Sequence, residues 1–313
     1  MQNTIIAQHR RTAWQRKLHK ALTSWQLYLL ILPAVVFVFI FHYMPMYGVV
    51  ISFKDFRASK GILGSPWVGL KHFTRFFKYP DFWKLIINTA RISIYSFLTF
   101  PLPIVLALMM NELRSQKFKK FAQMITYAPH FISTVVVCQI IMIFFDRSNG
   151  LVNNVAAMFG YERVPYLEIA RYFPSIYVWS DVWQNIGWDA IIYIATLSSV
   201  PPELVEAAQI DGAQKRHIIW HINIPTILPT IVIMLILRCG ALLNVGFEKT
   251  YLLQNALNMD YSQVIATYTY QLGLLNAQYS YSSAIGLFNT VINVILLLVV
   301  NTIAKKVSDI SLW

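Results

Sequence analysis

The sequence predicts an all-α integral membrane protein with six transmembrane helices, and three observations carry this prediction. Hydrophobic residues make up 57% of the 313 residues and charged residues 13%, about half the charged share of soluble domains. Several apolar runs exceed the roughly 18 residues that a helix needs to cross a bilayer. Lysine and arginine gather at the chain ends and between these runs, beside the predicted membrane surfaces.

The net charge of +12 fits a membrane protein better than a nucleic-acid-binding protein. A nucleic-acid-binding surface carries basic residues along one face, interleaved with aromatic side chains. Here the basic residues flank apolar runs, so we expect the lipid bilayer as a partner and no nucleic acid. Cys138 and Cys239 fall inside apolar runs and form no CxxC motif, so they identify no redox compartment.

The first element is a basic segment, residues 1–26, followed by the first span. Five cations in this segment resemble the start of a signal peptide. However, the apolar run from Leu27 to about Ser52 is too long for a signal peptide and lacks a clear cleavage site. We therefore expect a retained span behind a cytoplasmic segment, in which Trp14 and Trp25 also permit a helix at the membrane interface.

The spans form a single membrane domain, residues 27–304, followed by a cytoplasmic tail, residues 305–313. Each span is long enough to cross roughly 30 Å of hydrocarbon at about 1.5 Å per residue. The fourth is the least apolar. The predicted spans are about 27–52, 88–110, 121–145, 174–197, 224–245 and 282–304.

Basic residues orient the spans with both chain ends in the cytoplasm. The cytoplasmic segments carry the N-terminal cations, a group after the second span, Lys215 and Arg216, and the tail lysines. The outer segment 53–87 carries seven basic residues, but its length gives them less weight. Within it, stretch 69–87 mixes aromatic and basic residues and predicts a helix along the interface.

The segment between the fourth and fifth spans, residues 201–225, predicts two short helices around a glycine corner. Two prolines stop the preceding helix, and residues 203–211 form a helix that begins with an acidic residue. Gly212 supplies a helix stop or left-handed corner, and a basic helix, Lys215–His221, leads to Pro225. The pattern fits either a docking element or an ordinary amphipathic connector.

This segment resembles the EAA loop of ABC importer permeases. The family pattern is E-A-A-x3-G-x9-I-x-L-P, and the corresponding positions are Glu206, Ala207, Ala208, Gly212, Ile222, Ile224 and Pro225. Isoleucine at 224 in place of leucine is the one departure. Much of the remaining chain resembles the branch that imports oligosaccharides and polysaccharide fragments, over segments 41–56, 68–73, 111–133, 183–197, 244–255 and 311–313.

The resemblance implies a type I ABC importer permease fold in the bacterial cytoplasmic (inner) membrane. A cytoplasmic coupling helix around Glu206–Gly212 would sit in a cleft of an ATPase subunit. The implied partners are two ATPase subunits, a second homologous permease that forms a heterodimer, and an extracytoplasmic solute-binding protein. The implied coupling residues are Glu206, Ala207, Ala208, Asp211, Gly212, Ile222 and Pro225.

The implied function is uptake of an oligosaccharide or polysaccharide fragment by alternating access. The chain lacks the GxxxxGK[ST] loop that cradles nucleotide phosphates, so we expect no bound cofactor and no enzymatic activity. ATP and Mg would be used by the partner ATPases. A permease for a non-sugar solute, or a secondary transporter that needs no coupling loop, are the alternatives.

A polar stripe follows the fourth span. Asp181, Asn185 and Asp189 recur every four residues and therefore share one helix face. A charge at the centre of a membrane helix costs roughly 2.5–3.5 kcal/mol on insertion scales, so this face should avoid lipid. Carboxylates and amides bind sugar hydroxyls, and aromatic rings cover apolar sugar faces. The stripe is therefore a candidate substrate path, with further candidates Trp183, Gln184, Trp188, Asn244, Asn289 and Asn293.

Two other interpretations of the stripe stay open. Polar groups also join membrane helices, here to a partner permease or through an ion pair with Arg91 or Arg238. A proton relay is the third interpretation. We expect no metal site, because His217 and His221 lack a third ligand, and we expect His130 to be a packing or interfacial residue.

Overall fold

The computed structural model describes residues 24–308 and residue 311. Within this part of the chain every element is helical, apart from one β-bridge between Lys54 and Trp67. The interfacial helix that Trp14 permits lies outside the described residues, as do most of segment 1–26 and residues 309, 310, 312 and 313. The all-α prediction is confirmed for the described part of the chain.

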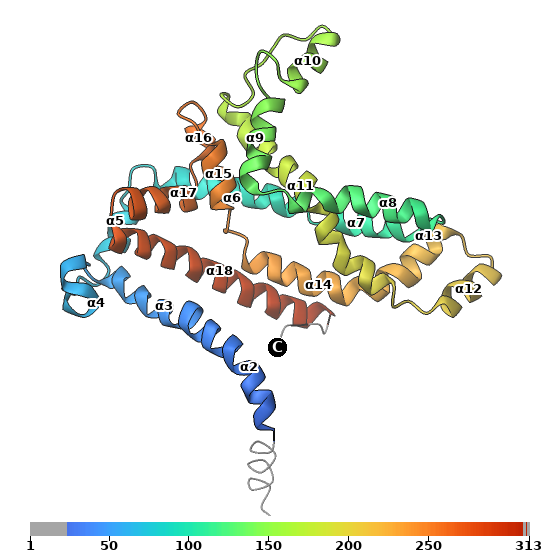
Figure 1. The fold of residues 1–313 in the computed structure, drawn as a ribbon, viewed down its shortest axis with the longest axis horizontal. Helices are drawn as coiled ribbons and strands as arrows, with labels where there is room; N and C mark the ends of the chain where they lie inside the picture. Colours follow the sequence, from blue (N-terminus) through green and yellow to red (C-terminus); the bar gives the residue numbers. More distant parts are fainter. Residues whose placement is uncertain (1–23, 309–310, 312–313) are drawn as a thin grey trace, which may run out of the picture.

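The first span is one long helix. It combines α2 (Trp25–Val38), a π turn η1 (Phe39–Tyr43), α3 (Met44–Met46) and a 3-10 segment η2 (Tyr47–Phe53). Pro45 has no N–H to donate, and just before it the bonding widens so that the Met44 N–H donates to the Phe39 carbonyl. Figure 1 shows α2 standing away from the bundle, while η2 packs against α18 (Tyr279–Ser308).

The second span combines α6 (Phe82–Leu98) and α7 (Pro101–Asn111) and begins at Phe82 rather than at residue 88. The interface helix predicted over 69–87 is correspondingly shorter. α5 (Lys71–Phe77) is a separate helix that ends before Pro80, and residues 82–87 belong to the span. Two further short elements, η3 (Ala58–Lys60) and α4 (Gly61–Gly64), precede α5.

The predicted third span, about 121–145, is not one continuous helix in the structure. α8 (Gln116–Tyr127) and the 3-10 turn η4 (Ala128–Phe131) meet α9 (Thr134–Phe144) at an angle of 101°. Pro129 lies beside the bend, and the Ser133 hydroxyl caps α9 by accepting a hydrogen bond from the Val136 N–H. Figure 1 shows α8 beside α7 and α9 turned away from both.

The fourth predicted span corresponds closely to α11 (Phe173–Leu197), which follows α10 (Leu151–Met158) and η5 (Ala170–Tyr172). α11 lies at the centre of the fold, where it contacts α6, α7, α8 and α14 (Ile224–Gly240). It contributes Tyr177 and Val178 to one buried cluster and Tyr193 to another. The polar stripe is therefore held by the most central helix of the chain.

The fifth span starts earlier and ends earlier than predicted. α13 (Lys215–Ile218), the π turn η6 (Ile219–Asn223) and α14 form one continuous helix that ends at Gly240 rather than at residue 245. The sixth span, α18, continues to Ser308, so the predicted tail from 305 is helical at its start. The connection between them holds α15 (Phe247–Leu253), α16 (Met259–Ser262), α17 (Ile265–Tyr270) and a π turn η7 (Gln271–Leu275).

By length and composition, the described residues contain four helices that fit a membrane span, or five if the bent α8–α9 pair is one span. By these criteria of length and composition, not all six predicted spans qualify as membrane spans. α11 is long enough but is too polar to qualify, because its stripe replaces apolar residues. The four are Trp25–Phe53, Phe82–Asn111, Lys215–Gly240 and Tyr279–Lys306.

Candidate functional site

The loop between α11 and α14 has the helix–glycine–helix form that the sequence predicts. α12 (Pro202–Ile210) starts at the predicted proline pair and carries Glu203 in its first turn. The helix ends where Gly212 adopts φ of 79°, and the Ala213 N–H folds back to the Ala208 carbonyl. This left-handed position, which glycine occupies without a steric penalty, sets the corner between the two helices.

α12 presents its side chains outward. Glu206 and Ala207 are exposed, and Ala208 is half-buried. Leu204 is 54% exposed and Ile210 86%, a high exposure for apolar side chains on so short a helix. Figure 1 shows α12 at one end of the long axis, with α4 and α5 at the other end.

The second half of the loop is firmly joined to the fifth span. Ile222 is half-buried in the π turn η6, and Pro225 lies exposed in the first turn of α14. Lys215 forms an ion pair with Glu112 at 3.4 Å, which ties the loop to the end of α7. Asp211 follows α12 directly and is exposed. α12 therefore extends from a helix that runs through the bundle.

The two histidines of this loop make local contacts. His221 donates from Nδ1 to the His217 carbonyl oxygen at 3.0 Å, and His217 Nδ1 accepts from the Gln214 N–H at 3.3 Å. Within the described residues, no group of three His, Cys, Asp or Glu side chains is placed to hold a metal ion.

The polar face of α11 is a connected network. The Asn185 amide donates to Asp181 Oδ1 at 3.0 Å, and Asn185 Oδ1 accepts from His130 Nδ1 at 2.9 Å. The His130 ring stacks on Trp188, with centroids 4.3 Å apart and planes within 6°. The Gln184 amide donates to the Ile132 carbonyl at 3.0 Å. The stripe thus contacts the bend between α8 and α9. This contact was not predicted from the sequence.

Two cations face this stripe. Arg238 on α14 lies 3.9 Å from Asp189, as one of the two ion pairs considered from the sequence. Lys249 on α15 lies 3.6 Å from Asp181. Lys249 was not predicted as a site residue, because it falls outside the predicted spans. The one available signal was its position in the segment 244–255 that resembles the permease family.

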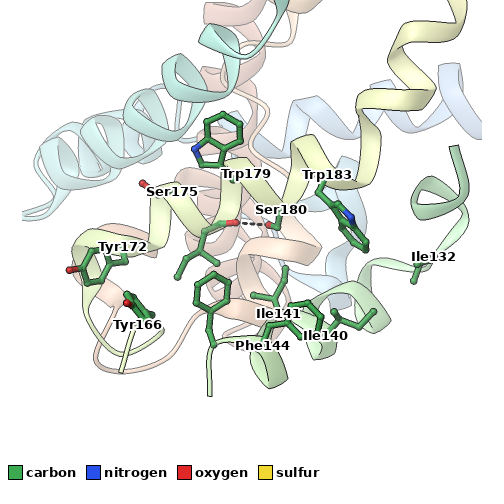
Figure 2. Close-up of a pocket in the computed structure, with 12 residues that line it drawn as sticks. Ile132, Ile140, Ile141, Phe144, Tyr166, Tyr172, Ser175, Trp179, Ser180 and Trp183 are labelled. Atoms are coloured by element: carbon green, nitrogen blue, oxygen red, sulfur yellow. Dashed lines mark hydrogen bonds between the residues drawn. The ribbon is translucent and has the colours of Figure 1, made fainter. Parts of the chain in front are cut away.

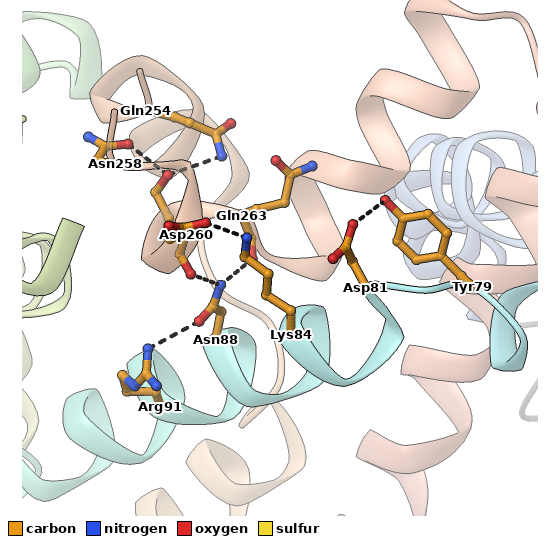
Figure 3. Close-up of polar contacts among 10 residues, drawn as sticks. Tyr79, Asp81, Lys84, Asn88, Arg91, Gln254, Asn258, Asp260 and Gln263 are labelled. Atoms are coloured by element: carbon orange, nitrogen blue, oxygen red, sulfur yellow. Dashed lines mark hydrogen bonds and ion pairs between the residues drawn. The ribbon is translucent and has the colours of Figure 1, made fainter. Parts of the chain in front are cut away.

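Arg91 does not pair with the stripe. It donates to Asn88 at 3.1 Å and lies 4.2 Å above the Tyr261 ring. Figure 3 shows this second network, in which Asn88 also donates to the carbonyls of Asp260 and Gln263. These bonds fasten α16 to α6, so the proposed Arg91 ion pair with the stripe is wrong.

Two polar cavities adjoin the stripe. One, of about 500 Å³, is lined by Asp181, Gln184, Asn185, His130 and Lys249 among others. A second, of about 360 Å³, is lined by Asp181 with Arg238, Asn244 and residues of α6. Asp181 is common to both. The polar face of α11 therefore borders open space.

Trp183 lies elsewhere. It lines an apolar cavity of about 700 Å³ between α9 and α11, together with Trp179, Ile140 and Phe144 (Figure 2). Trp179 donates from its indole N–H to the Tyr95 hydroxyl at 2.8 Å. The structure therefore separates Trp183 from the polar stripe, although the two share one helix.

The three asparagines of the later spans bond to one another. Asn289 and Asn293 on α18 both donate to Asn244 Oδ1, at 3.2 and 2.9 Å. Asn293 Oδ1 accepts from the Leu243 N–H at 3.1 Å. This arrangement joins the end of α14 to α18, which favours a packing role for Asn289 and Asn293. Asn244 also lines a polar cavity.

Comparison with known proteins gives concordant matches. The sequence profile of the family described as "Binding-protein-dependent transport system inner membrane component" matches residues 99–309. A permease protein of Bacillus subtilis, YteP of the polygalacturonan/rhamnogalacturonan transport system, is 41% identical over 300 residues, covering 96% of this chain and 94% of the relative.

Two solved structures are similar along nearly the whole chain. One is a crystal structure of a bacterial ABC transporter involved in the import of the acidic polysaccharide alginate, with a TM-score of 0.85 and 38% identity. The other is a bacterial alginate ABC transporter in complex with an alginate pentasaccharide-bound periplasmic protein, with a TM-score of 0.86 and 37% identity. Each match covers 94% of this chain and 99% of the solved chain.

Proposed function

The chain belongs to the family of inner membrane components of binding-protein-dependent transport systems, and from this premise we propose that it is the permease subunit of an importer for acidic oligosaccharides or polysaccharide fragments. As a member of this family it is a multi-pass inner membrane protein and a transport subunit rather than an enzyme. An importer reaction needs a path, a source of energy and a supply of substrate, and the proposal assigns each.

The path crosses the membrane through six spans. α11 is the fourth of them, despite its polarity, and the bent α8–α9 pair is the third. The similarity to the solved importer chains, at TM-scores of 0.85 and 0.86, supports a shared membrane fold. A polar helix is stable in a membrane when its polar face lines a cavity or another helix, and α11 does both.

The energy comes from partner ATPases that dock on α12. The single observation that carries this assignment is a helix with exposed apolar residues, set at one end of the molecule by the Gly212 corner. Because the chain has no phosphate-binding loop of its own, nucleotide chemistry has to enter through a partner. Two ATPase subunits, which bind ATP and Mg, and a second homologous permease complete the assembly.

The substrate arrives on an extracytoplasmic solute-binding protein. Support comes from the relatives, whose names specify polygalacturonan, rhamnogalacturonan and alginate, and from the solved complex with a saccharide-bound periplasmic protein. These polymers share carboxylate-bearing sugars. The preferred substrates are therefore fragments of uronic acid polymers.

Within the membrane, the path follows the polar face of α11. Asp181, Gln184 and Asn185 border the larger polar cavity, and Asp189 borders a smaller space shared with Arg238. Trp188 is 44% exposed, and its stacking on His130 keeps an aromatic surface beside the amides. Amides beside an exposed ring suit the two faces of a sugar. For Asp189, however, the ion pair with Arg238 supports the alternative interpretation, in which this residue has a packing role.

Reconstitution tests the proposal. The permease is incorporated into proteoliposomes with its partner permease, the ATPases and the binding protein, and uptake of labelled trigalacturonate is measured with and without ATP. We expect uptake with ATP and the complete assembly. Transport down a gradient by this chain alone, without ATPases, would identify a self-contained carrier and refute the importer assignment.

A further inference from the structure

Lys249 is a buried cation beside the proposed path. Its side chain is 6% exposed, and among the described residues its Nζ atom has no hydrogen-bond partner. The nearest carboxylate oxygen, Oδ1 of Asp181, is 3.6 Å away, and the Tyr177 ring centroid is 5.1 Å away. An ammonium group has three donors, and burying them without acceptors is unfavourable. The site therefore has unused capacity to bind an acceptor.

Asp181 is more exposed than Lys249, although both residues line one polar cavity. Both residues line the cavity of about 500 Å³, yet the Asp181 side chain is 39% exposed, whereas Lys249 is buried. The carboxylate, rather than the ammonium, therefore faces the cavity. An anion that enters the cavity therefore competes with Asp181 for the ammonium of Lys249.

A second cation is available to Asp181. Asp181 and Arg238 together line two further cavities, of about 360 and 10 Å³. Arg238 donates one hydrogen bond, to the Ser96 carbonyl at 3.0 Å, and lies 3.9 Å from Asp189. A guanidinium group has five N–H donors arranged for bidentate binding of carboxylates, so Arg238 has donors left for Asp181.

These contacts lead to one inference, which rests on the proposed function. We propose that Lys249 binds a carboxylate of the transported sugar acid, and that Asp181 occupies the position of that carboxylate while the path is empty. On substrate entry, Asp181 turns toward Arg238, and the sugar carboxylate takes its place at the ammonium. Lys249 thereby makes the path selective for uronates over neutral sugars.

The charges around the cavity agree with an anionic ligand. Neutral sugars need uncharged hydrogen-bonding groups, and the Gln184 and Asn185 amides supply these without the cost of a buried ammonium. Glu248 also lines the cavity, but it is exposed, so water screens its charge. The Lys249 charge, in contrast, is held where screening by water is weak.

Uptake by the reconstituted complete importer tests the inference, with trigalacturonate as the acidic probe and galactotriose as the neutral one. Lys249→Gln should lower trigalacturonate uptake by about tenfold, the usual size of a lost charge-assisted hydrogen bond. Lys249→Arg should retain most of the uptake because it keeps the charge. Asp181→Asn should not lower the ratio of trigalacturonate uptake to galactotriose uptake, since it removes the carboxylate that competes at Lys249.

The double variant Lys249→Gln/Asp181→Asn separates substrate binding from a structural ion pair. If Lys249 binds substrate, the double variant stays as defective as Lys249→Gln. Recovery of uptake in the double variant would overturn the inference, as would unchanged uptake in Lys249→Gln.

ATP-driven uptake of galactotriose but not trigalacturonate by the unmodified importer would also overturn it while leaving the importer assignment intact. Absence of ATP-driven uptake for both sugars would instead refute the proposed function. Copurification with the partner subunits controls for assembly of each variant.

Discussion

Gly187 on α11 lies so close to Thr126 on α8 that a Cβ atom at position 187 would stand 2.2 Å from the Thr126 carbonyl oxygen. This close approach holds the end of α8 against the polar helix. The following turn, η4, then places His130 within hydrogen-bond distance of Asn185. The geometry of the stripe therefore depends on glycine, which has no side chain, at position 187.

Gly187→Ala should disturb this packing. The new methyl group meets backbone rather than a flexible side chain, so the two helices have to separate, at a cost of about 1–3 kcal/mol. We expect a lower melting temperature in detergent and reduced uptake. Gly286→Ala is the matched control, because a Cβ there meets nothing within 4 Å. Equal melting temperatures for the two variants would contradict the account.

Gly212→Val should weaken coupling without preventing membrane insertion. A β-branched residue at φ of 79° is strained by about 1–2 kcal/mol, so the corner after α12 should open. The expected result is reduced copurification of the ATPases and reduced uptake. Gly212→Asn should lose less, since asparagine tolerates left-handed conformations. If valine and asparagine behave alike, the corner geometry is not what matters.

Trp188→Ala should impair uptake while the complex stays assembled. The substitution removes the ring that stacks on His130 and forms the exposed aromatic surface beside Asn185. We expect uptake to fall by about tenfold, as for loss of one stacking contact of about 1.4 kcal/mol. Trp83→Ala, at a 69% exposed position on α6, should have little effect. Normal uptake kinetics in Trp188→Ala would favour the interpretation of the stripe as helix packing.

Asn293→Leu should destabilise the protein. Asn293 is 6% exposed and links Asn244 and the Leu243 N–H to α18, so the substitution leaves two polar groups without this partner. A loss of about 1–3 kcal/mol is expected for such groups. Asn289→Leu, at an outlying position of the same cluster, should cost less. Thermal unfolding in detergent measures both, and a reversed order would argue against the bonding described.

The parts of the site that follow from local chemistry were predictable from the sequence. Proline begins α12, and glycine ends it and forms the corner that follows. The i, i+4, i+8 spacing alone puts Asp181, Asn185 and Asp189 on one helix face. The α8–α9 bend was not predictable, because a proline in a membrane helix is often accommodated without one. Lys249 is a tertiary partner, and no periodicity within α15 connects it to α11.

The two sides of α11 differ in how far the sequence predicted them. Its low apolarity was visible in the sequence, and it indicated a helix face that avoids lipid. Trp183 also belongs to this helix, yet it faces the apolar cavity beside Phe144. Only the packing of α9 distinguishes the two sides of α11.

In the proposed function, energy from partner ATPases enters this chain through α12. Deleting Glu206 through Gly212 tests it most directly, with ATPase copurification and ATP-driven uptake of trigalacturonate measured on the membrane-inserted variant. We predict normal insertion, loss of ATPase association and loss of uptake. Uptake that continues at the level of the intact protein would contradict the account, because a self-contained carrier has no need of this helix.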